Sequence, residues 1–168
     1  RISMNSSESK LNSKRILSKN LNFNDKKLKL IEEFVKEVLI FNKKYNLISQ
    51  SSEKEIWERH VLDSAQLIKY INHKNFNSVA DLGTGAGFPG ILLSIFYSDI
   101  LTFHVKLYEK SKVKITFLKG LVEKLKLNNI SIYENDYQSH IIDSDYIVCR
   151  AFKKLPEILR ISRETVKK

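Results

Sequence analysis

Residues 80–90 read ADLGTGAGFPG and hold four of the five glycines of this 168-residue chain. A short apolar run precedes the first of these glycines, and an aliphatic stretch, residues 91–96, follows the last. This pattern predicts a strand, a tight loop and a helix. Glycines permit positive φ and let bare backbone approach a ligand, and the free N–H groups of a helix start favour an anionic group. The loop is therefore typical of a nucleotide-binding cradle.

Size and composition set broad limits. A length of 168 residues with 42% hydrophobic residues is enough for one domain with a buried core. No apolar run reaches membrane-spanning length, so we expect a cytoplasmic protein with no membrane segment. The single cysteine, Cys149, excludes an internal disulfide. The four histidines lack metal-ligand spacing, and we predict no metal. The net charge of +10 suits a polyanionic partner, although a solvated lysine-rich surface explains it as well.

The chain divides into three regions. Residues 1–22 are rich in serine, asparagine and lysine, and we predict a flexible basic arm. An organelle transit peptide would share this composition. Residues 23–72 carry helical periodicity and are predicted to form an N-terminal helical extension. Residues 73–168 contain the glycine loop and are predicted to form the nucleotide-binding domain.

Two helices are expected in the helical extension. Asn24 can cap the first of them, and Phe23 is placed to pack against Leu28 at its start. The second helix is predicted to begin at Ser52, which has capping-box spacing to Glu55. Both helices precede the glycine loop.

Strand and helix patterns alternate through the third region. Strands are expected at residues 79–82, 103–108, 130–133 and 146–149, and helices at residues 90–96, 112–127 and 155–166. This alternation predicts an α/β fold with a doubly wound parallel sheet. Only four strands are found, so we expect the domain to be incomplete at its C-terminal end. Ligands bind outside the carboxyl ends of such strands, where the glycine loop, Glu109, Asp136 and Arg150 lie.

The sequence of the loop is compatible with two cofactors, NAD and S-adenosylmethionine (SAM). Residues 85–90 match the dinucleotide pattern GxGxxG, which is weak evidence for NAD. Against NAD, Asp81 and Gly83 precede the match and Pro89 lies inside it. An acid at a strand end followed by Gly-x-Gly-x-Gly is instead the pattern of methyltransferases that bind SAM. The loop therefore favours SAM.

SAM carries an amino acid end and an adenosine in place of phosphates. Asp81 is expected to hold the ammonium group of SAM or to organise the loop. The glycines expected to allow close approach of the methionine moiety are Gly83, Gly85 and Gly87. Glu109, at the end of the next strand, is expected to accept the ribose hydroxyls. Its alternative is an exposed acid beside neighbouring lysines.

Four blocks of the sequence together resemble a known family. They are YNLIS (45–49), ERHVLDS (58–64), ADLGTGAGFPGILLSI (80–95) and CRAF (149–152). Their order and spacing resemble RsmG, also called GidB, the family of bacterial 16S ribosomal RNA guanine-N7 methyltransferases, from about residue 23 onward. The resemblance implies SAM-dependent methylation of one guanosine in small-subunit RNA, and we expect a monomeric enzyme.

The resemblance also implies a cofactor-binding set. Carried over by position, this set is Gly83, Phe88, the backbone around Tyr137 and Gln138, and Arg150. The chain departs from the family after the third strand, where arginine and glutamate are usual and Asp136 and Gln138 stand here. The roles of these two side chains are therefore left open.

Methylation at guanine N7 needs no general base, because N7 is already nucleophilic and the SAM methyl group is electrophilic. Alignment of the reacting atoms supplies much of the acceleration, so no catalytic residue is assigned. Phe152 is a candidate for stacking on the target base or for ordinary packing. Arg59 and His60 are candidates for RNA docking, with an Arg59–Asp63 helix salt bridge and a polar network behind the loop as alternatives. Trp57 is expected in the core.

Arg150 emerges where the fourth strand ends and is expected to border the cofactor pocket. Its expected partner is the SAM carboxylate, Asp81 or an RNA phosphate. A partner is expected because an arginine at the end of an apolar strand is costly to desolvate unless its charge is paired. An ion pair with an acid of the N-terminal helices is the alternative. For the whole chain, a noncatalytic RNA-binding module and an NAD-binding oxidoreductase are the alternatives to the methyltransferase.

Overall fold

The computed structural model of this chain describes residues 6–74, 77–134, 142–150 and 159–160. Its centre is a parallel sheet in the order β3-β2-β1-β4. The strands are β1 (Ser78–Leu82), β2 (His104–Tyr108), β3 (Ile130–Tyr133) and β4 (Tyr146–Cys149). Each of the four strands predicted from sequence is confirmed, with bounds that agree to within one residue. The helix expected at residues 155–166 lies almost entirely outside the described residues.

The strand order reverses beside β1. Leu82, the last residue of β1, is paired with Tyr108 of β2 on one side and with Cys149 of β4 on the other. The carboxyl ends of the three strands therefore meet at one edge of the sheet. Such a switch point is where open α/β sheets bind ligands. The glycine loop, Glu109 and Arg150 all follow strands that end there.

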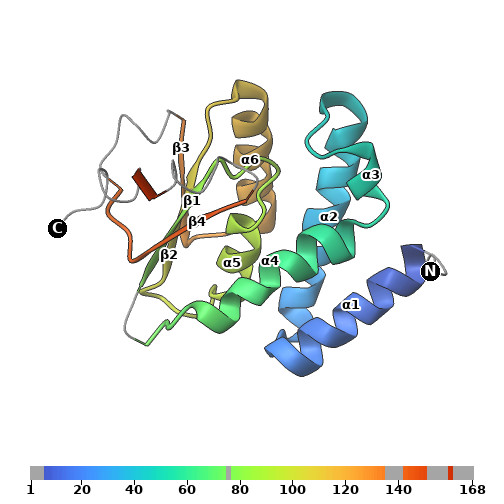
Figure 1. Ribbon diagram of the computed structural model, residues 1–168, viewed down its shortest axis with the longest axis horizontal. Helices are drawn as coiled ribbons and strands as arrows, with labels where there is room; N and C mark the ends of the chain where they lie inside the picture. Colours follow the sequence, from blue (N-terminus) through green and yellow to red (C-terminus); the bar gives the residue numbers. More distant parts are fainter. Residues whose placement is uncertain (1–5, 75–76, 135–141, 151–158, 161–168) are drawn as a thin grey trace.

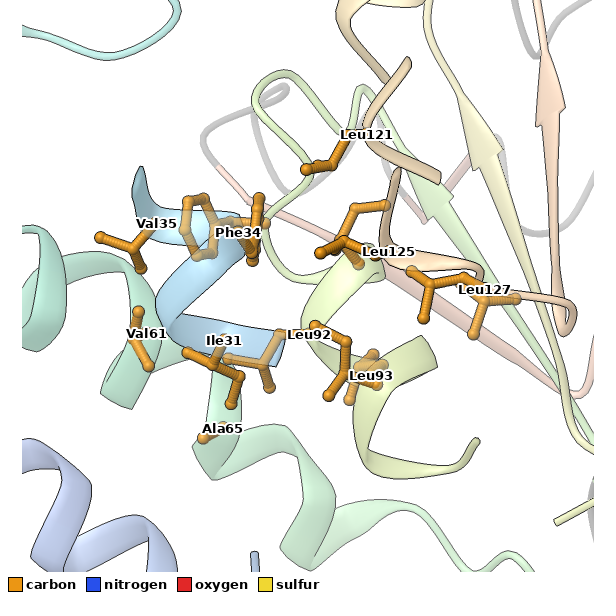
Figure 2. Packing of buried hydrophobic residues seen from close by; sticks show 14 of the residues in the cluster. Ile31, Phe34, Val35, Val61, Ala65, Leu92, Leu93, Leu121, Leu125 and Leu127 are labelled. Carbon is orange, nitrogen blue, oxygen red and sulfur yellow. The ribbon is translucent and has the colours of Figure 1, made fainter. Parts of the chain in front are cut away.

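Two helices cover one face of the sheet, α5 (Gly90–Phe96) and α6 (Lys112–Leu125). Figure 1 shows them between the sheet and the N-terminal helices, of which α2 (Asp25–Tyr45) is the longest. Side chains of α2, α5 and α6 meet in one buried cluster (Figure 2). The members labelled there are Ile31, Phe34, Val35, Val61, Ala65, Leu92, Leu93, Leu121, Leu125 and Leu127. This shared core makes the helical extension and the sheet one packed unit.

The start of α2 follows from its sequence. The side chain of Asn24 accepts a hydrogen bond from the Lys27 N–H at 2.9 Å, which confirms the predicted cap. Phe23 is buried, and its ring centroid lies 4.8 Å from that of Phe96 in α5. The helix ends at Tyr45 and is capped by Asn46, whose φ of 48° is left-handed.

The second helix of the extension differs from the prediction. It begins with α3 (Gln50–Glu53), and Ser49, not Ser52, is its cap. The Ser52 N–H donates to Ser49 Oγ at 3.3 Å, and the Ser52 hydroxyl donates to the Ser49 carbonyl at 3.0 Å. Ser52 is thereby already inside the first turn, so the predicted Ser52–Glu55 capping box is wrong. Three short elements then replace one helix: π-helix η1 (Trp57–Leu62), α4 (Asp63–Ala65) and 3-10 helix η2 (Gln66–Tyr70).

The flexible basic arm predicted for residues 1–22 is also wrong for its described part. Residues Ser6–Leu21 form helix α1, which packs against η1. Its buried residues recur at every fourth position: Ser9, Ser13, Leu17 and Leu21. Two leucines and two small serines make a narrow stripe that can be buried although the segment is polar as a whole. Composition masked this stripe, because serine does not stand out as a core residue.

No helix in the described part of the chain has the length and apolar character of a membrane span.

Candidate functional site

The loop after β1 is held to the end of β2 by its own backbone. The N–H groups of Gly83 and Thr84 both donate to the Tyr108 carbonyl, at 2.9 and 3.2 Å. Gly83, Gly85 and Gly87 have φ values of 70°, 60° and 98°. At Gly87 packing adds to this requirement, because a Cβ there would lie 2.6 Å from a side-chain carbon of Ile91. The loop therefore needs glycine for its path.

Asp81 is sealed beneath this loop. Its side chain is fully buried, and Oδ2 accepts the Gly90 N–H at 2.8 Å, where α5 begins. A Cβ on residue 90 would lie 2.7 Å from the same oxygen, so only glycine fits there. Burial raises the pKa of Asp81 to about 6, against the opposing effect of the Gly90 hydrogen bond. Of the two roles open to Asp81, this geometry favours organising the loop.

Glu109 holds the middle of the loop from the end of β2. Oε2 accepts the Gly85 N–H at 3.0 Å, and Oε1 accepts the N–H groups of Lys110 and Ser111, both at 2.9 Å. The side chain is buried, so the alternative of an exposed acid beside neighbouring lysines is wrong. Carboxylate oxygens can accept more than one hydrogen bond each, which leaves capacity for a ligand hydroxyl.

Arg150 bridges β4 and the helical extension. Its Nη1 donates to the Arg59 carbonyl at 2.8 Å and lies 3.6 Å from Asp63 Oδ2. Its Nη2 is hydrogen-bonded to Nδ1 of His60, and the guanidinium carbon lies 5.8 Å from the Phe88 ring centroid. Arg150 thus both borders the loop and pairs with an acid of the N-terminal helices. The ion pair that the sequence offered as the alternative is therefore present, and a contact of Arg150 with the cofactor stays a prediction.

His60 is neutral in this arrangement. Burial, followed by the charge of Arg150, lowers the pKa of His60 to about 4. Because a guanidinium can only donate, Nδ1 must accept, and the proton of the neutral ring must sit on Nε2. The ring centroid lies 5.2 Å from that of Phe88. Nε2 is buried and has no hydrogen-bond partner among the described residues.

The Arg59–Asp63 helix salt bridge considered from sequence is wrong. Arg59 pairs with Glu55 one turn earlier, while Asp63 faces Arg150. The Arg59 side chain is 58% exposed, so it can reach a partner outside the chain. Trp57 is buried, as expected.

A cleft of about 520 Å³ lies between the glycine loop and the helical extension. It is lined by residues 47–49, Ser52, Arg59, His60, residues 83–86, Phe88, Lys114 and Arg150. Six of the nine predicted site residues that the structure describes thus line the cleft, while Asp81, Gly87 and Glu109 do not line it and support the loop from behind. Tyr137, Gln138 and Phe152 lie outside the described residues, as does Asp136.

Sequence reasoning did not assign one wall of the cleft. Ser49 and Ser52 come from the turn between α2 and α3, and Lys114 comes from the first turn of α6. The block YNLIS, which ends at Ser49, was part of the family resemblance and could have pointed to this wall. Within the described residues, no group of three or more His, Cys, Asp and Glu side chains could hold a metal ion.

The fold is that of SAM-dependent methyltransferases. Coclaurine N-methyltransferase, bound to N-methylheliamine and S-adenosylhomocysteine, matches with TM-score 0.54 and 14% identity, covering 98% of this chain and 58% of that one. A Plasmodium falciparum protein in complex with S-adenosylhomocysteine, assigned as a protein-L-isoaspartate O-methyltransferase, matches with TM-score 0.59 and 17% identity, covering 99% and 81%. At such identities the likeness establishes the fold alone, and it confirms the predicted fold class.

The family is established by sequence. The family model described as rRNA small subunit methyltransferase G, GidB, matches residues 27–168. The ribosomal RNA small subunit methyltransferase G of Pelagibacter ubique is 40% identical over 146 residues, which are 85% of this chain and 68% of that protein. Its namesake from Borreliella burgdorferi is 36% identical over 150 residues, 88% of this chain and 71% of that protein. The chain therefore belongs to this family.

Family membership confirms the predicted resemblance and the predicted enzyme class, against the oxidoreductase alternative. The relative from Magnetococcus marinus is 40% identical over 126 residues, 75% of this chain and 54% of that protein. The matched part thus spans between 54% and 71% of the length of these three relatives.

Proposed function

We propose that this chain transfers the methyl group of SAM to N7 of a guanine in 16S ribosomal RNA, in the cytoplasm, on assembled or partly assembled small subunits. One observation carries the proposal beyond family membership. The cleft at the switch point of the sheet is bounded by the glycine loop on one side and by Arg150 on the other. SAM requires of such a place a cation that can meet its amino acid carboxylate and bare backbone that it can approach closely.

The residues present fit SAM. Gly83 and Gly85 would face the methionine moiety, and Arg150 would meet its carboxylate. A Cβ on Gly85 would meet nothing nearer than the Gly83 carbonyl at 3.9 Å, so the space beside Gly85 is open to a ligand. Glu109 would accept a ribose hydroxyl with its remaining acceptor capacity. Phe88 would close the pocket from the loop side, with its ring packed on Phe34 at 4.5 Å.

The chain contributes position, not proton transfer. SAM supplies an electrophilic methyl group, and N7 of guanine has a free lone pair, so no residue needs to remove a proton. Rigid walls that hold the two reactants in line account for much of the acceleration. The loop is rigid because Asp81, Glu109 and the Tyr108 carbonyl each accept its N–H groups.

RNA recognition rests on charge in this proposal. The chain carries a formal net charge of +10, and Arg59 and Lys114 stand at the cleft. Phosphate contacts of this kind give affinity that falls as salt rises. Phe152 remains a candidate for stacking on the target base, with ordinary packing as the alternative.

The test is a methyl-transfer assay. The protein is incubated with tritium-labelled SAM and small ribosomal subunits that lack N7-methylguanosine, and the RNA is digested to nucleosides. We expect label in N7-methylguanosine of 16S RNA, and none with subunits that are already methylated. Label found only on protein or on a small molecule would reject the proposal, as would RNA binding without transfer or tight binding of NAD in place of SAM.

A further inference from the structure

The guanidinium of Arg150 is held from the helical extension. Among the described residues, its hydrogen-bond acceptors are the Arg59 carbonyl and His60 Nδ1, which lie 91 and 90 residues away in the sequence. Asp63 lies further off, at 3.6 Å, and its side chain is 57% exposed, so this ion pair contributes little. Because a guanidinium is a planar fork, acceptors at two of its nitrogens fix both its position and its plane.

His60 is itself fixed. Its side chain is more than nine-tenths buried, and its ring packs on Phe88, which packs on Phe34 of α2. The imidazole is therefore held in one orientation by packing, and its Nδ1 determines the position of the Arg150 guanidinium. Its burial also leaves it poorly placed to touch RNA, the role that the sequence had suggested.

The local backbone supports a site at this point. Arg59 and His60 belong to π-helix η1, whose geometry is rare in proteins and frequent at functional sites. Both residues, Arg150 and the glycine loop line the same cleft. The π-helix η1 thus places the Arg59 carbonyl and His60 Nδ1 beside the cleft, where β4 ends.

We propose that His60 is a positioning residue of the cofactor site. As a neutral imidazole it accepts a hydrogen bond from Arg150 and holds the guanidinium at the cleft, ready to meet the carboxylate of SAM. The inference rests on the proposed function for the identity of that ligand. A preorganised arginine binds more tightly than one that must first be ordered, because less side-chain entropy is lost on binding.

The experiment measures binding of S-adenosylhomocysteine by calorimetry in the full chain, with folding checked by circular dichroism. His60→Phe keeps a ring against Phe88 and removes the acceptor, and we expect affinity to fall by about tenfold, as in Arg150→Ala. The double variant should bind no more weakly than Arg150→Ala alone, because both changes act through one guanidinium. His60→Asn, whose amide oxygen can stand near the place of Nδ1, should recover most of the affinity.

His104→Phe is the matched control. The His104 ring is hydrogen-bonded to the Ser131 hydroxyl at 2.8 Å, and neither residue lines the cleft. This variant should bind S-adenosylhomocysteine like the wild type. Wild-type affinity in folded His60→Phe, or strictly additive losses in the double variant, would overturn the inference and leave the proposed function standing. A wild-type protein that binds neither SAM nor S-adenosylhomocysteine would overturn both.

A second measurement tests the contact without any ligand. Long-range proton–nitrogen NMR correlations should show His60 at neutral pH with a bare Nδ1 and a protonated Nε2. A proton on Nδ1, or a charged ring, would contradict the hydrogen bond from Arg150 and with it the inference.

Discussion

Two acids stand at neighbouring strand ends of this molecule and hold the same loop in different ways. Asp81, at the end of β1, is fully buried and accepts one N–H, from Gly90 at the start of α5. Glu109, just past β2, is 8% exposed and accepts three N–H groups, one of them from Gly85 in the middle of the loop. The first anchors a core helix to the sheet, and the second shapes the wall of the cleft.

Their glycine partners differ in the same sense. A side chain on Gly90 would collide with Leu107 and with Asp81, whereas a side chain on Gly85 would meet only open space and one carbonyl at 3.9 Å. One glycine is required by protein packing, and the other leaves room for a ligand. The comparison teaches that one glycine motif serves two purposes: Gly90 allows the loop to pack against the sheet, and Gly85 leaves space for a ligand.

The largest expected effect is at Gly90. Gly90→Ala forces a methyl group against Leu107 and Asp81 and disturbs the hydrogen bond to Asp81, so we expect a loss of about 4 kcal/mol in the free energy of unfolding. Urea unfolding measures it. Gly120→Ala is the control, because a Cβ there meets nothing within 4 Å, and this change should stabilise α6 by about 0.5–1 kcal/mol. Equal free energies of unfolding for Gly90→Ala and Gly120→Ala would contradict the conclusion that protein packing requires glycine at position 90.

The next effect is the pH dependence carried by Asp81. Its folded-state pKa of about 6 lies above the ordinary value of 3.8, so the folded protein binds more protons than the unfolded chain between these values. The free energy of unfolding should therefore fall as pH rises from about 4 to 6, by about 3 kcal/mol at most. Asp81→Asn should lack this slope.

The quantity to compare is the difference in the free energy of unfolding between the wild type and Asp81→Asn at each pH, because this difference removes the contributions of other groups. His60, with a folded-state pKa of about 4 against 6.5, contributes the opposite slope, because stability is lost as pH falls through that window. This contribution is common to wild type and Asp81→Asn and cancels in their difference. A difference that stays constant with pH would mean that Asp81 titrates normally.

The smallest effect on stability, and a large one on binding, is expected at Gly85. Gly85→Val places a branched residue at a φ of 60°, which costs about 1–2 kcal/mol in strain, but the Cβ that it adds meets nothing nearer than the Gly83 carbonyl at 3.9 Å. The chain should remain folded and lose detectable binding of S-adenosylhomocysteine in calorimetry. Binding at wild-type strength would show that the cofactor does not approach the loop here and would sharpen the case for another subsite.

Much of the fold could be predicted because it is written in local patterns. The four strands and α5 and α6 were predicted from apolar runs and turn residues, which act over a few positions. The Asn24 cap was equally local. Helix α1 was missed because its buried face includes two serines, and the cap at Ser49 was missed because Ser52 offered the same pattern one turn later.

The candidate site was predicted in its residue types more than in their contacts. Asp81, the loop glycines and Arg150 were all expected near one edge of the sheet, and the described structure places them there. The hydrogen bond that Glu109 accepts from the Gly85 N–H, and the wall made by Ser49 and Ser52, were not foreseen. Each joins segments separated by many residues, for which no short motif exists.

The sequence by itself determined the parallel sheet, the glycine loop and the class of enzyme, because periodicity and motif spacing are properties of neighbouring residues. Only the tertiary structure decided the partners of Arg150. Its guanidinium is held by Arg59 and His60, which reach it because the helical extension packs on α5 through the shared apolar core. Apolar packing is non-directional, so it fixes which surfaces meet only when the whole core is assembled.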